Sequence, residues 1–417
     1  MQIPLDSPGR KALLLAACLL LTAGYLGFSL AEFVASYYSS RSDLASLHRS
    51  IWLQPGNAEY RYRLGRYFSL VEQAPQAAVD SFRSAVALNP HDARYWFDLA
   101  SEYQLLGNTD AQKDALEHAI AANPRTPDAA WEAANFYLVQ GETDKALHEF
   151  RVVLENNLGM APAALKLCWR INPDVDAILQ SVVPPDPQVY FAFLDILMAK
   201  KETAGAAKVW AQLAQLRQPF AARHIFDYFR YLIAMREVDQ ARTVWQEAAT
   251  LCGLSAYLPS SQNLMVNGDF SLDVLNGGFD WSYLTLSGVS LAFDPSQPHL
   301  GHRSLSMVFD SRGLDDAGIR QLVPVEPNTA YEFSAYFKAE NIQGAGGPRF
   351  TVQDVYHENI YFQSDDLKDA DFWKPVGGAF ITGPDAKLLV VRVQRVPGGS
   401  PIKGKLWIGS VRLARKH

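Results

Sequence analysis

Residues 91–124 read HDARYWFDLASEYQLLGNTDAQKDALEHAIAANP, and this stretch decides the fold of the first half of the chain. It ends in an Asn-Pro pair, and comparable Gln-Pro and Asn-Pro pairs end at Pro55 and Pro90. The prolines at 55, 90 and 124 are spaced 35 and 34 residues apart, a period that is typical of stacked helix pairs. Proline lacks the backbone N–H that a helix interior needs, so it ends the second helix of each pair.

Large and small apolar residues recur within this period, as expected where two antiparallel helices approach closely. The recurring residues are Leu64, Gly65, Phe68, Ala78, Phe82 and Ala85, then Trp96, Leu99, Ala100, Tyr103, Leu116 and Ala119, then Ala133, Ala134, Tyr137, Ala146, Phe150 and Val153. The pattern resembles the tetratricopeptide repeat family. The resemblance implies an all-α helical solenoid, with repeats over 42–158 and diverged repeats over 159–255. One extra residue around 72–76 predicts a longer turn inside the first repeat.

In the family that this pattern resembles, the first helix of each pair lines a concave groove. The fifth position of that helix carries an aromatic residue in all three segments, and hydrogen-bonding side chains fall on the same side. An aromatic ladder of this kind is suited to holding an extended peptide or a partner helix. The predicted groove residues are Tyr62, Arg66, Arg94, Phe97, Trp131 and Asn135. The same periodicity also fits rings that only pack between neighbouring helices, so both interpretations stay open.

An apolar run, ALLLAACLLLTAGYLGFSLA at residues 12–31, precedes the repeats and has no charged side chain. About twenty helical residues match a hydrocarbon core of roughly 30 Å. Arg10 and Lys11 precede the run, and basic residues favour the cytoplasmic side of a membrane. The run therefore predicts one transmembrane helix in a bacterial inner membrane. Residues 1–11 would be cytoplasmic, and the body of the chain periplasmic or extracellular.

Two other interpretations of the apolar run stay open. Small residues at Ser29 and Ala31 fit cleavage by a signal peptidase after Ala31. Leu15-Ala16-Ala17-Cys18 resembles a lipobox, which implies lipidation of Cys18. The apolar run continues well past this cysteine, which favours an uncleaved anchor over a lipoprotein signal.

The composition changes near residues 256–262, where Ser and Pro replace the Ala-rich helical pattern, and this segment is predicted to be a linker. Apolar and polar residues then alternate at 330–338, 349–356 and 388–395, with Gly and Pro between the runs. Alternation with a period of two indicates strands that are half buried. Several short strands of this kind predict an antiparallel β-sandwich over 263–417.

Four motifs give this segment a family resemblance. They are NLMVNGDF at 263–270, GFDW at 278–281, GHRSLSM at 301–307 and GKLWIGSVRL at 404–413. In this order they resemble carbohydrate-binding modules of the four-and-nine type and their galactose-binding-like relatives, which implies a jelly-roll sandwich and a polysaccharide ligand. Many members of this family carry an Asp-Asp pair that helps to hold calcium. This chain has Gly409-Ser410 at the same place. We therefore expect no metal and no cofactor.

A sugar site on a sandwich needs aromatic faces and planar polar side chains on one accessible sheet face. If the phenylalanines and valines of the three alternating runs point inward, the residues between them point outward. Trp281 and Trp373, on flanking segments, would add stacking platforms. The predicted carbohydrate-binding residues are Trp281, Tyr336, Gln353, Trp373, Arg392 and Gln394. The alternative is a solvated outer face with both tryptophans packed at the sandwich edges.

Several function classes lack support in the sequence. The net charge is −6, and no stripe of Lys and Arg suits a nucleic-acid backbone, so nucleic acid is not expected as a partner. Phosphate-loop, nucleophile-elbow and zinc-helix motifs are absent from the sequence, and we predict no catalytic residue. His299 and His302 and the acidic turn at 365–371 are more typical of surface loops than of metal or catalytic sites. Cys168 and Cys252 could form a disulfide, but packing thiols are expected.

The sequence therefore predicts a multidomain, non-enzymatic envelope scaffold that is anchored in a membrane. Its repeats would bind a protein partner and its sandwich a glycan, in exopolysaccharide or cell-envelope assembly. The alternative is a pure protein-interaction adaptor whose sandwich is structural or binds protein.

Overall fold

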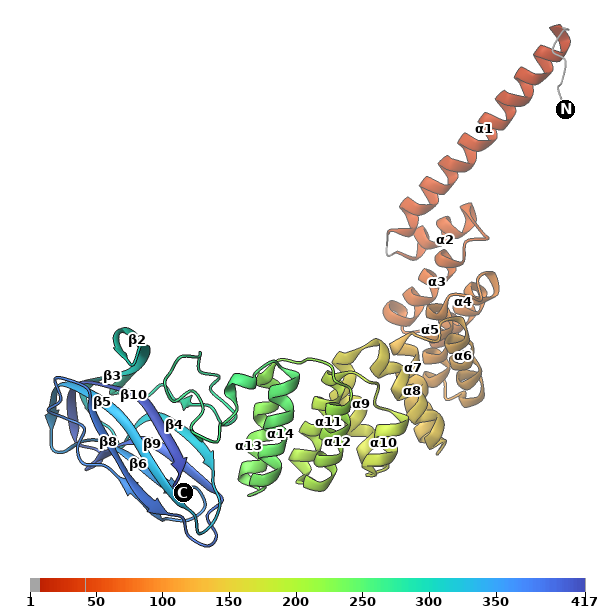
Figure 1. Ribbon diagram of the computed structural model, residues 1–417. Coiled ribbons are helices and arrows are strands. Elements are labelled where there is room, and N and C mark those ends of the chain that lie inside the picture. The colour runs from red at the N-terminus through yellow and green to blue at the C-terminus, as the bar shows by residue number, and fades with distance from the viewer. Residues whose placement is uncertain (1–7, 42, 417) are drawn as a thin grey trace. The chain divides into compact units, whose positions relative to one another are not determined.

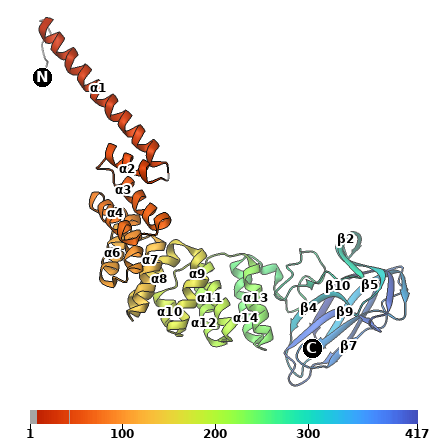
Figure 2. The same cartoon turned by 180° about the vertical axis from the view of Figure 1, so that it is seen from behind.

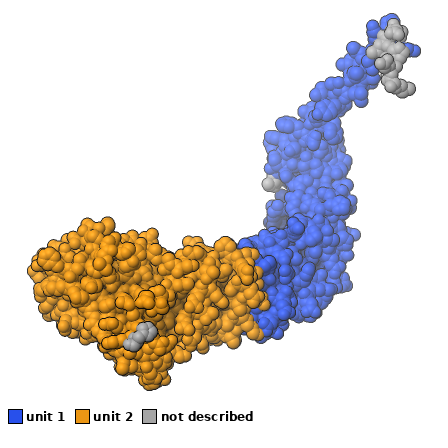
Figure 3. Space-filling model, in the orientation of Figure 1, with its two compact units in different colours: residues 1–189 blue, residues 190–417 orange. Residues whose placement is uncertain are grey.

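The computed structural model describes residues 8–41 and 43–416, with helices first and strands last (Figure 1). The chain separates into two compact units, residues 1–189 and 190–417 (Figure 3). The division falls within helix α11 (Pro187–Lys200). Residues 1–7 of the predicted cytoplasmic segment lie outside the described residues.

The predicted apolar run lies within one helix, α1 (Pro8–Ser39), which has 32 residues. The most apolar window of this helix is not buried by any other part of the chain. The helix is long and apolar enough to cross a membrane, although a signal sequence meets the same criteria. A core helix of a soluble domain would be covered on at least one face, whereas the apolar window of α1 is uncovered and only its last part, with Ala35 and Ser39, is buried.

Helix pairs follow α1 in the first unit, and consecutive pairs lie side by side in the ribbon (Figure 1). They are α2 (Leu44–Leu53), α3 (Ala58–Tyr67), α4 (Pro75–Leu88), α5 (Ala93–Leu105), α6 (Thr109–Ala122), α7 (Pro127–Val139), α8 (Thr143–Asn156), α9 (Ala161–Ile171) and α10 (Val175–Ser181). The extra residue of the first repeat lies in a π-helical turn, Phe68–Glu72. Gln73 ends this turn in the left-handed conformation (φ 52°). The extra residue is therefore accommodated as a π-helical extension of the first helix and not as a longer turn, because only residues 73–74 separate this extension from α4.

Local sequence sets the ends and the spacing of these helices. The Asp92 side chain accepts from the Arg94 N–H at the start of α5, and the Asn108 side chain accepts from the Ala111 N–H at the start of α6. A Cβ at Gly65 would lie 2.5 Å from the ring of Phe82. Only glycine therefore lets α3 and α4 approach this closely.

The diverged region is helical, as predicted. It comprises α9 and α10 in the first unit and then α11, α12 (Thr203–Gln215), α13 (Phe226–Ala234) and α14 (Val238–Leu251). Both cysteines of this region are free thiols, so the alternative of a disulfide is not realised. Burial raises the pKa of the Cys168 thiol to about 12, which makes it unreactive at neutral pH.

The last part of the chain is a sandwich of two antiparallel five-stranded sheets (Figure 2). The strands are β1 (Ser282–Tyr283), β2 (Val289–His299), β3 (His302–Gly313), β4 (Asp316–Pro324), β5 (Ala330–Gly344), β6 (Gly347–Asp354), β7 (Ile360–Gln363), β8 (Lys374–Ile381), β9 (Leu388–Val396) and β10 (Pro401–Arg415). The order is β1-β4-β9-β6-β7 in the first sheet and β2-β3-β10-β5-β8 in the second. Phe333, Phe350, Val352 and Val391 fill the core between the sheets, as their alternation predicts.

Within the second unit, α13 and α14 pack directly on one end of the sandwich. The rings of Phe229 and Phe279 meet edge to face at 4.7 Å. The Tyr356 hydroxyl donates to the backbone oxygen of Ile233 at 2.8 Å. Gly278 lies against the Trp245 ring, where an added Cβ would be 2.2 Å away. The last helix pair and the sandwich therefore share a packed interface.

Candidate functional site

The first candidate site is a cavity of about 450 Å³ in the repeat array. Its lining includes four of the six predicted groove residues, namely Tyr62, Arg66, Arg94 and Phe97. Trp131 and Asn135 lie on α7 and do not line this cavity. The structure therefore brings the predicted residues of α3 and α5 together at one cavity but leaves those of α7 beside it.

The three aromatic residues of the predicted ladder, Tyr62, Phe97 and Trp131, have different surroundings. Tyr62 is buried and its ring lies 4.7 Å from that of Tyr95, so it packs between helices. The ring of Trp131 meets Phe150 edge to face at 5.6 Å. Phe97 is half buried and lines the cavity. The packing interpretation therefore describes the contacts of Tyr62 and Trp131, and Phe97 is the ring with an exposed part in the cavity.

Three carboxylates that the sequence analysis did not single out also line this cavity: Asp98, Glu102 and Asp128. Burial raises the pKa of Asp98, against the smaller lowering effects of a hydrogen bond from Tyr62 and the charges of Arg66 and Arg94. Arg94 is itself held by Asp92, with Nη2 and Oδ2 2.7 Å apart. The cavity thus combines three carboxylates with two arginines, of which Arg94 is already paired.

A signal for Glu102 was present in the repeat register. The residue one period later is Phe136, which is buried. An acidic residue therefore occupies a position at which the next repeat has an apolar core side chain. Such a substitution inside a repeat pattern is visible in the sequence, but its accessibility from a cavity is not.

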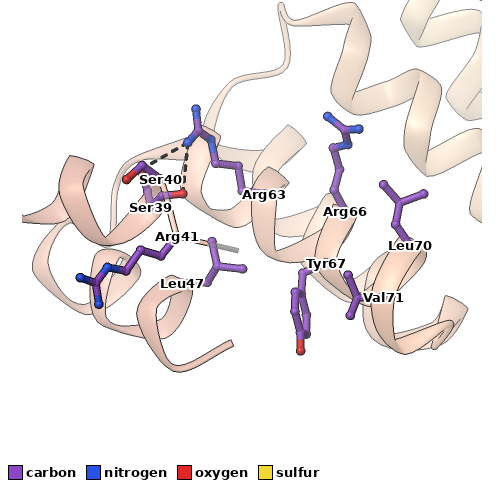
Figure 4. Close-up of a pocket in the computed structure, with 9 residues that line it drawn as sticks. All are labelled: Ser39, Ser40, Arg41, Leu47, Arg63, Arg66, Tyr67, Leu70 and Val71. Atoms are coloured by element: carbon purple, nitrogen blue, oxygen red, sulfur yellow. Dashed lines mark hydrogen bonds between the residues drawn. The ribbon is translucent and has the colours of Figure 1, made fainter. Parts of the chain in front are cut away.

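A second cavity of about 320 Å³ lies where α1, α2 and α3 meet (Figure 4). Arg41, Arg63 and Arg66 line it. The Arg63 guanidinium donates to the backbone oxygen of Ser39 at 3.2 Å, which ties the end of α1 to the first repeat. Arg66 and Leu70 line both this cavity and the larger one, so the two are neighbours along α3.

The third candidate is a polar strip on the outer face of the first sheet, formed by Gln353, Arg392 and Gln394. The Arg392 Nη2 donates to Gln353 Oε1 at 2.6 Å. With its amide oxygen turned toward Arg392, Gln394 accepts from Nη2 at 2.8 Å, and its nitrogen donates to Thr351. These three predicted residues therefore form one hydrogen-bonded group.

A cavity of about 440 Å³ adjoins the polar strip, and Arg392 lines it together with Asp315, Asp316 and Arg320. The Nη1 of Arg392 lies 3.6 Å from Asp316 Oδ2. Burial raises the pKa of Asp316, while the Gly318 N–H and the charge of Arg392 oppose this shift. Arginine, carboxylate and amide groups thus meet at one open hollow.

The other predicted sugar-binding residues lie elsewhere. Tyr336 and Trp373 lie on the side of the second sheet. The ring of His299 contacts both, with its centroid 4.3 Å from that of Tyr336 and 4.8 Å from that of Trp373. His299 Nδ1 is 2.7 Å from the hydroxyl of Ser410. Because β5 belongs to one sheet and β6 and β9 to the other, Tyr336 and Gln353 face opposite sides of the sandwich. A single face carrying all six residues is therefore not formed.

The prediction that Trp281 binds sugar is wrong. This residue is 0% exposed and part of the sandwich core. Its indole N–H donates to the backbone oxygen of Asn267 at 3.0 Å, and its ring lies 5.4 Å from that of Phe270. Neither ring face is open to a sugar, because the side chain fills the space between the sheets.

The comparisons with known proteins agree with this architecture in one segment. Residues 93–126 match the family described as "Tetratricopeptide repeat". These residues form a tetratricopeptide repeat. The segment coincides with α5 and α6, and the helix pairs α3–α4 and α7–α8 on either side of it pack in the same pairwise way. A search of curated proteins finds no match to this chain.

Several solved structures are similar to parts of the chain. MamA is 20% identical over 41% of this chain and 85% of its own, with a TM-score of 0.27. PilF from Pseudomonas aeruginosa is 16% identical over 54% of this chain and 90% of its own, with a TM-score of 0.28. A CBM4 structure is 16% identical over 36% of this chain and 98% of its own, with a TM-score of 0.28.

Proposed function

We propose that this protein is a membrane-anchored envelope scaffold whose tetratricopeptide repeats hold a protein partner and whose sandwich binds a glycan through the polar strip. The observation that carries the glycan proposal is the cavity of about 440 Å³ beside Arg392. Sugars present many hydroxyl groups, each of which can donate and accept hydrogen bonds. Arginine, amide and carboxylate groups that meet at an open hollow supply both partners.

The geometry of the strip supports this role. The Arg392 guanidinium is held from several sides by Gln353, Gln394 and Asp316. A group that is held in place before binding loses less conformational freedom when a ligand arrives. Leu284 and Leu286 line the same cavity and offer apolar contact to the C–H surfaces of a sugar ring.

A glycan array tests this proposal with the full-length chain in detergent. We expect saturable binding to at least one glycan, reduced about tenfold or more by Gln353→Ala and by Arg392→Ala, since each change removes planar hydrogen-bonding groups. Gln343→Ala is the matched control, because this glutamine is exposed on β5 of the second sheet.

The outcomes separate three cases. Loss of binding in Gln353→Ala and Arg392→Ala alone supports the polar strip. Loss in Tyr336→Ala and Trp373→Ala alone would move the site to the opposite face. A folded protein that binds no glycan would leave the adaptor alternative, in which the sandwich is structural or binds protein.

The anchoring part of the proposal rests on α1. Its apolar window is uncovered, and Arg10 and Lys11 at its start favour a cytoplasmic N-terminus. The intact mass of the chain purified from membranes distinguishes an anchor from a signal sequence. A mass that includes residues 1–31 supports the anchor, and a mass that begins after Ala31 contradicts it.

A further inference from the structure

Glu102 on α5 is a buried carboxylate, and one of its two oxygens has no partner among the described residues. Its residue is 3% exposed, and its Oε2 has no hydrogen-bond partner among the described residues. A buried ionised group costs several kcal/mol unless it is paired. Such a group is therefore unusual in a folded protein unless something completes its hydrogen bonds.

This carboxylate lines the cavity of about 450 Å³, so a ligand in the cavity can complete its hydrogen bonds. Asp98 lies one turn earlier on α5, and Asp128 reaches the cavity from the first turn of α7. Arg66 and Arg94 also line the cavity. Arg94, however, is engaged by Asp92 and lies 3.5 Å from Glu59. The charge of Arg66 acts on Asp98, and neither arginine supplies the missing partner of Glu102 Oε2.

The partly exposed ring of Phe97 lies at the same cavity. The face of an aromatic ring attracts a cation, and most strongly where water is excluded. A cationic group in this cavity would therefore meet carboxylates and a ring face together. An anionic group would instead be repelled by both.

An exposed apolar row runs beside the cavity in the repeat period. Leu70, Leu105 and Val139 are spaced 35 and 34 residues apart and are 65%, 73% and 84% exposed. Leu105 lies seven residues after Asp98 on α5, so both fall on one stripe of the helix. Leu70 also lines the cavity. A partner that reaches the acidic groups can thus cover apolar side chains in the same binding event.

We propose that this groove binds a peptide segment in which a lysine or arginine is flanked by apolar residues. The basic side chain enters the cavity and pairs with Glu102 and Asp98, and the apolar neighbours cover Leu70 and Leu105. This inference rests on the proposed protein-binding function of the repeats, and it defines the chemistry of the partner.

The test is a selection of random peptides displayed on phage against the full-length chain in detergent. We expect the selected peptides to share a Lys or Arg beside apolar residues. Glu102→Gln and Asp98→Asn should each weaken a selected synthetic peptide at least about tenfold, because a buried charge then loses its partner. Replacing the basic residue of that peptide with norleucine should have an effect of the same size on the unaltered chain.

Glu149→Gln is the matched control. Glu149 is also buried, at 7% exposure, and its Oε2 also lacks a partner among the described residues, but it does not line this cavity. Its replacement should leave peptide affinity unchanged. Both variants replace a buried carboxylate that has an unpartnered oxygen with a neutral amide of similar shape, so we expect both to fold, and circular dichroism checks this.

The remaining outcomes separate the inference from the function beneath it. Peptides that lose affinity in Phe97→Ala but carry no basic residue, or that tolerate Glu102→Gln, overturn the cationic inference and leave the groove as a binding site. Peptides that all tolerate both Phe97→Ala and Glu102→Gln overturn both, since the groove is then not where partners bind.

Discussion

Replacing Trp281 with alanine is expected to lower the free energy of unfolding of the sandwich by about 3–5 kcal/mol, as for other large aromatic residues that leave a core cavity. Trp281 is completely buried between the sheets. The change also removes the indole donor to Asn267, which leaves a carbonyl oxygen without its partner. Urea denaturation followed by hydrogen exchange of peptides from β5 and β10 measures the effect within the sandwich.

Trp373→Ala is the comparison for this prediction. Trp373 is only half buried, and its indole N–H donates to the backbone oxygen of Pro298 at 3.1 Å. We expect a loss of about 1 kcal/mol, because little apolar surface returns to water. Equal losses of unfolding free energy in the two variants would show that Trp281 does not stabilise the core more than Trp373 does.

Asp280 is expected to make the stability of the second unit fall as the pH rises from about 4 to 6. Burial raises the pKa of this carboxyl from its ordinary value of 3.8 to about 6. The folded state therefore keeps the proton after the unfolded chain has released it, and folding is favoured below the lower value. The stability lost across this interval is about 3 kcal/mol at 1.36 kcal/mol per pKa unit.

Asp280→Asn should abolish this pH dependence. Asn can still accept the hydrogen bond that the Leu275 N–H donates to Asp280 Oδ2, and it has no charge to desolvate. We expect the variant to match the unaltered chain at pH 4 and to exceed its stability by about 3 kcal/mol at pH 7.

Asp273→Asn controls for the loss of a carboxylate in the same loop. The Asp273 side chain is 95% exposed and pairs with Arg303, so its removal should change stability by less than about 1 kcal/mol. The midpoints of urea denaturation, measured at pH 4 and pH 7 for both variants, test this prediction. If Asp280→Asn gives no gain at pH 7, Asp280 does not hold its proton in the folded state.

Much of the candidate site in the repeats could be predicted because it follows a period. Tyr62, Phe97 and Trp131 occupy equivalent places, and two of them reach one cavity. The sequence left open whether Tyr62 packs between helices, and its contact with Tyr95 could not be predicted because it joins residues of different repeats. Glu102 was missed because a lone acidic residue in a helical pattern normally points to solvent.

The sandwich site was harder to predict, because alternation along a strand shows only whether a side chain points toward the core or away from it. The inward set, including Phe333 and Val391, was correct. The outward side chains of β5 and those of β9 nevertheless point in opposite directions, since these strands belong to different sheets. Tyr336 was for this reason assigned to the same face as Arg392.

The sequence by itself determined the elements: the apolar α1, the helix pairs with their proline and glycine boundaries, and the alternating strands. Each depends on residues that are near one another in the chain, through backbone geometry and a short period. Only the tertiary structure decided which strands share a sheet, that Trp281 is in the core, and that one oxygen of Glu102 lacks a partner among the described residues at a cavity. Those facts depend on contacts between distant segments, and no local pattern encodes which surfaces meet when the chain packs.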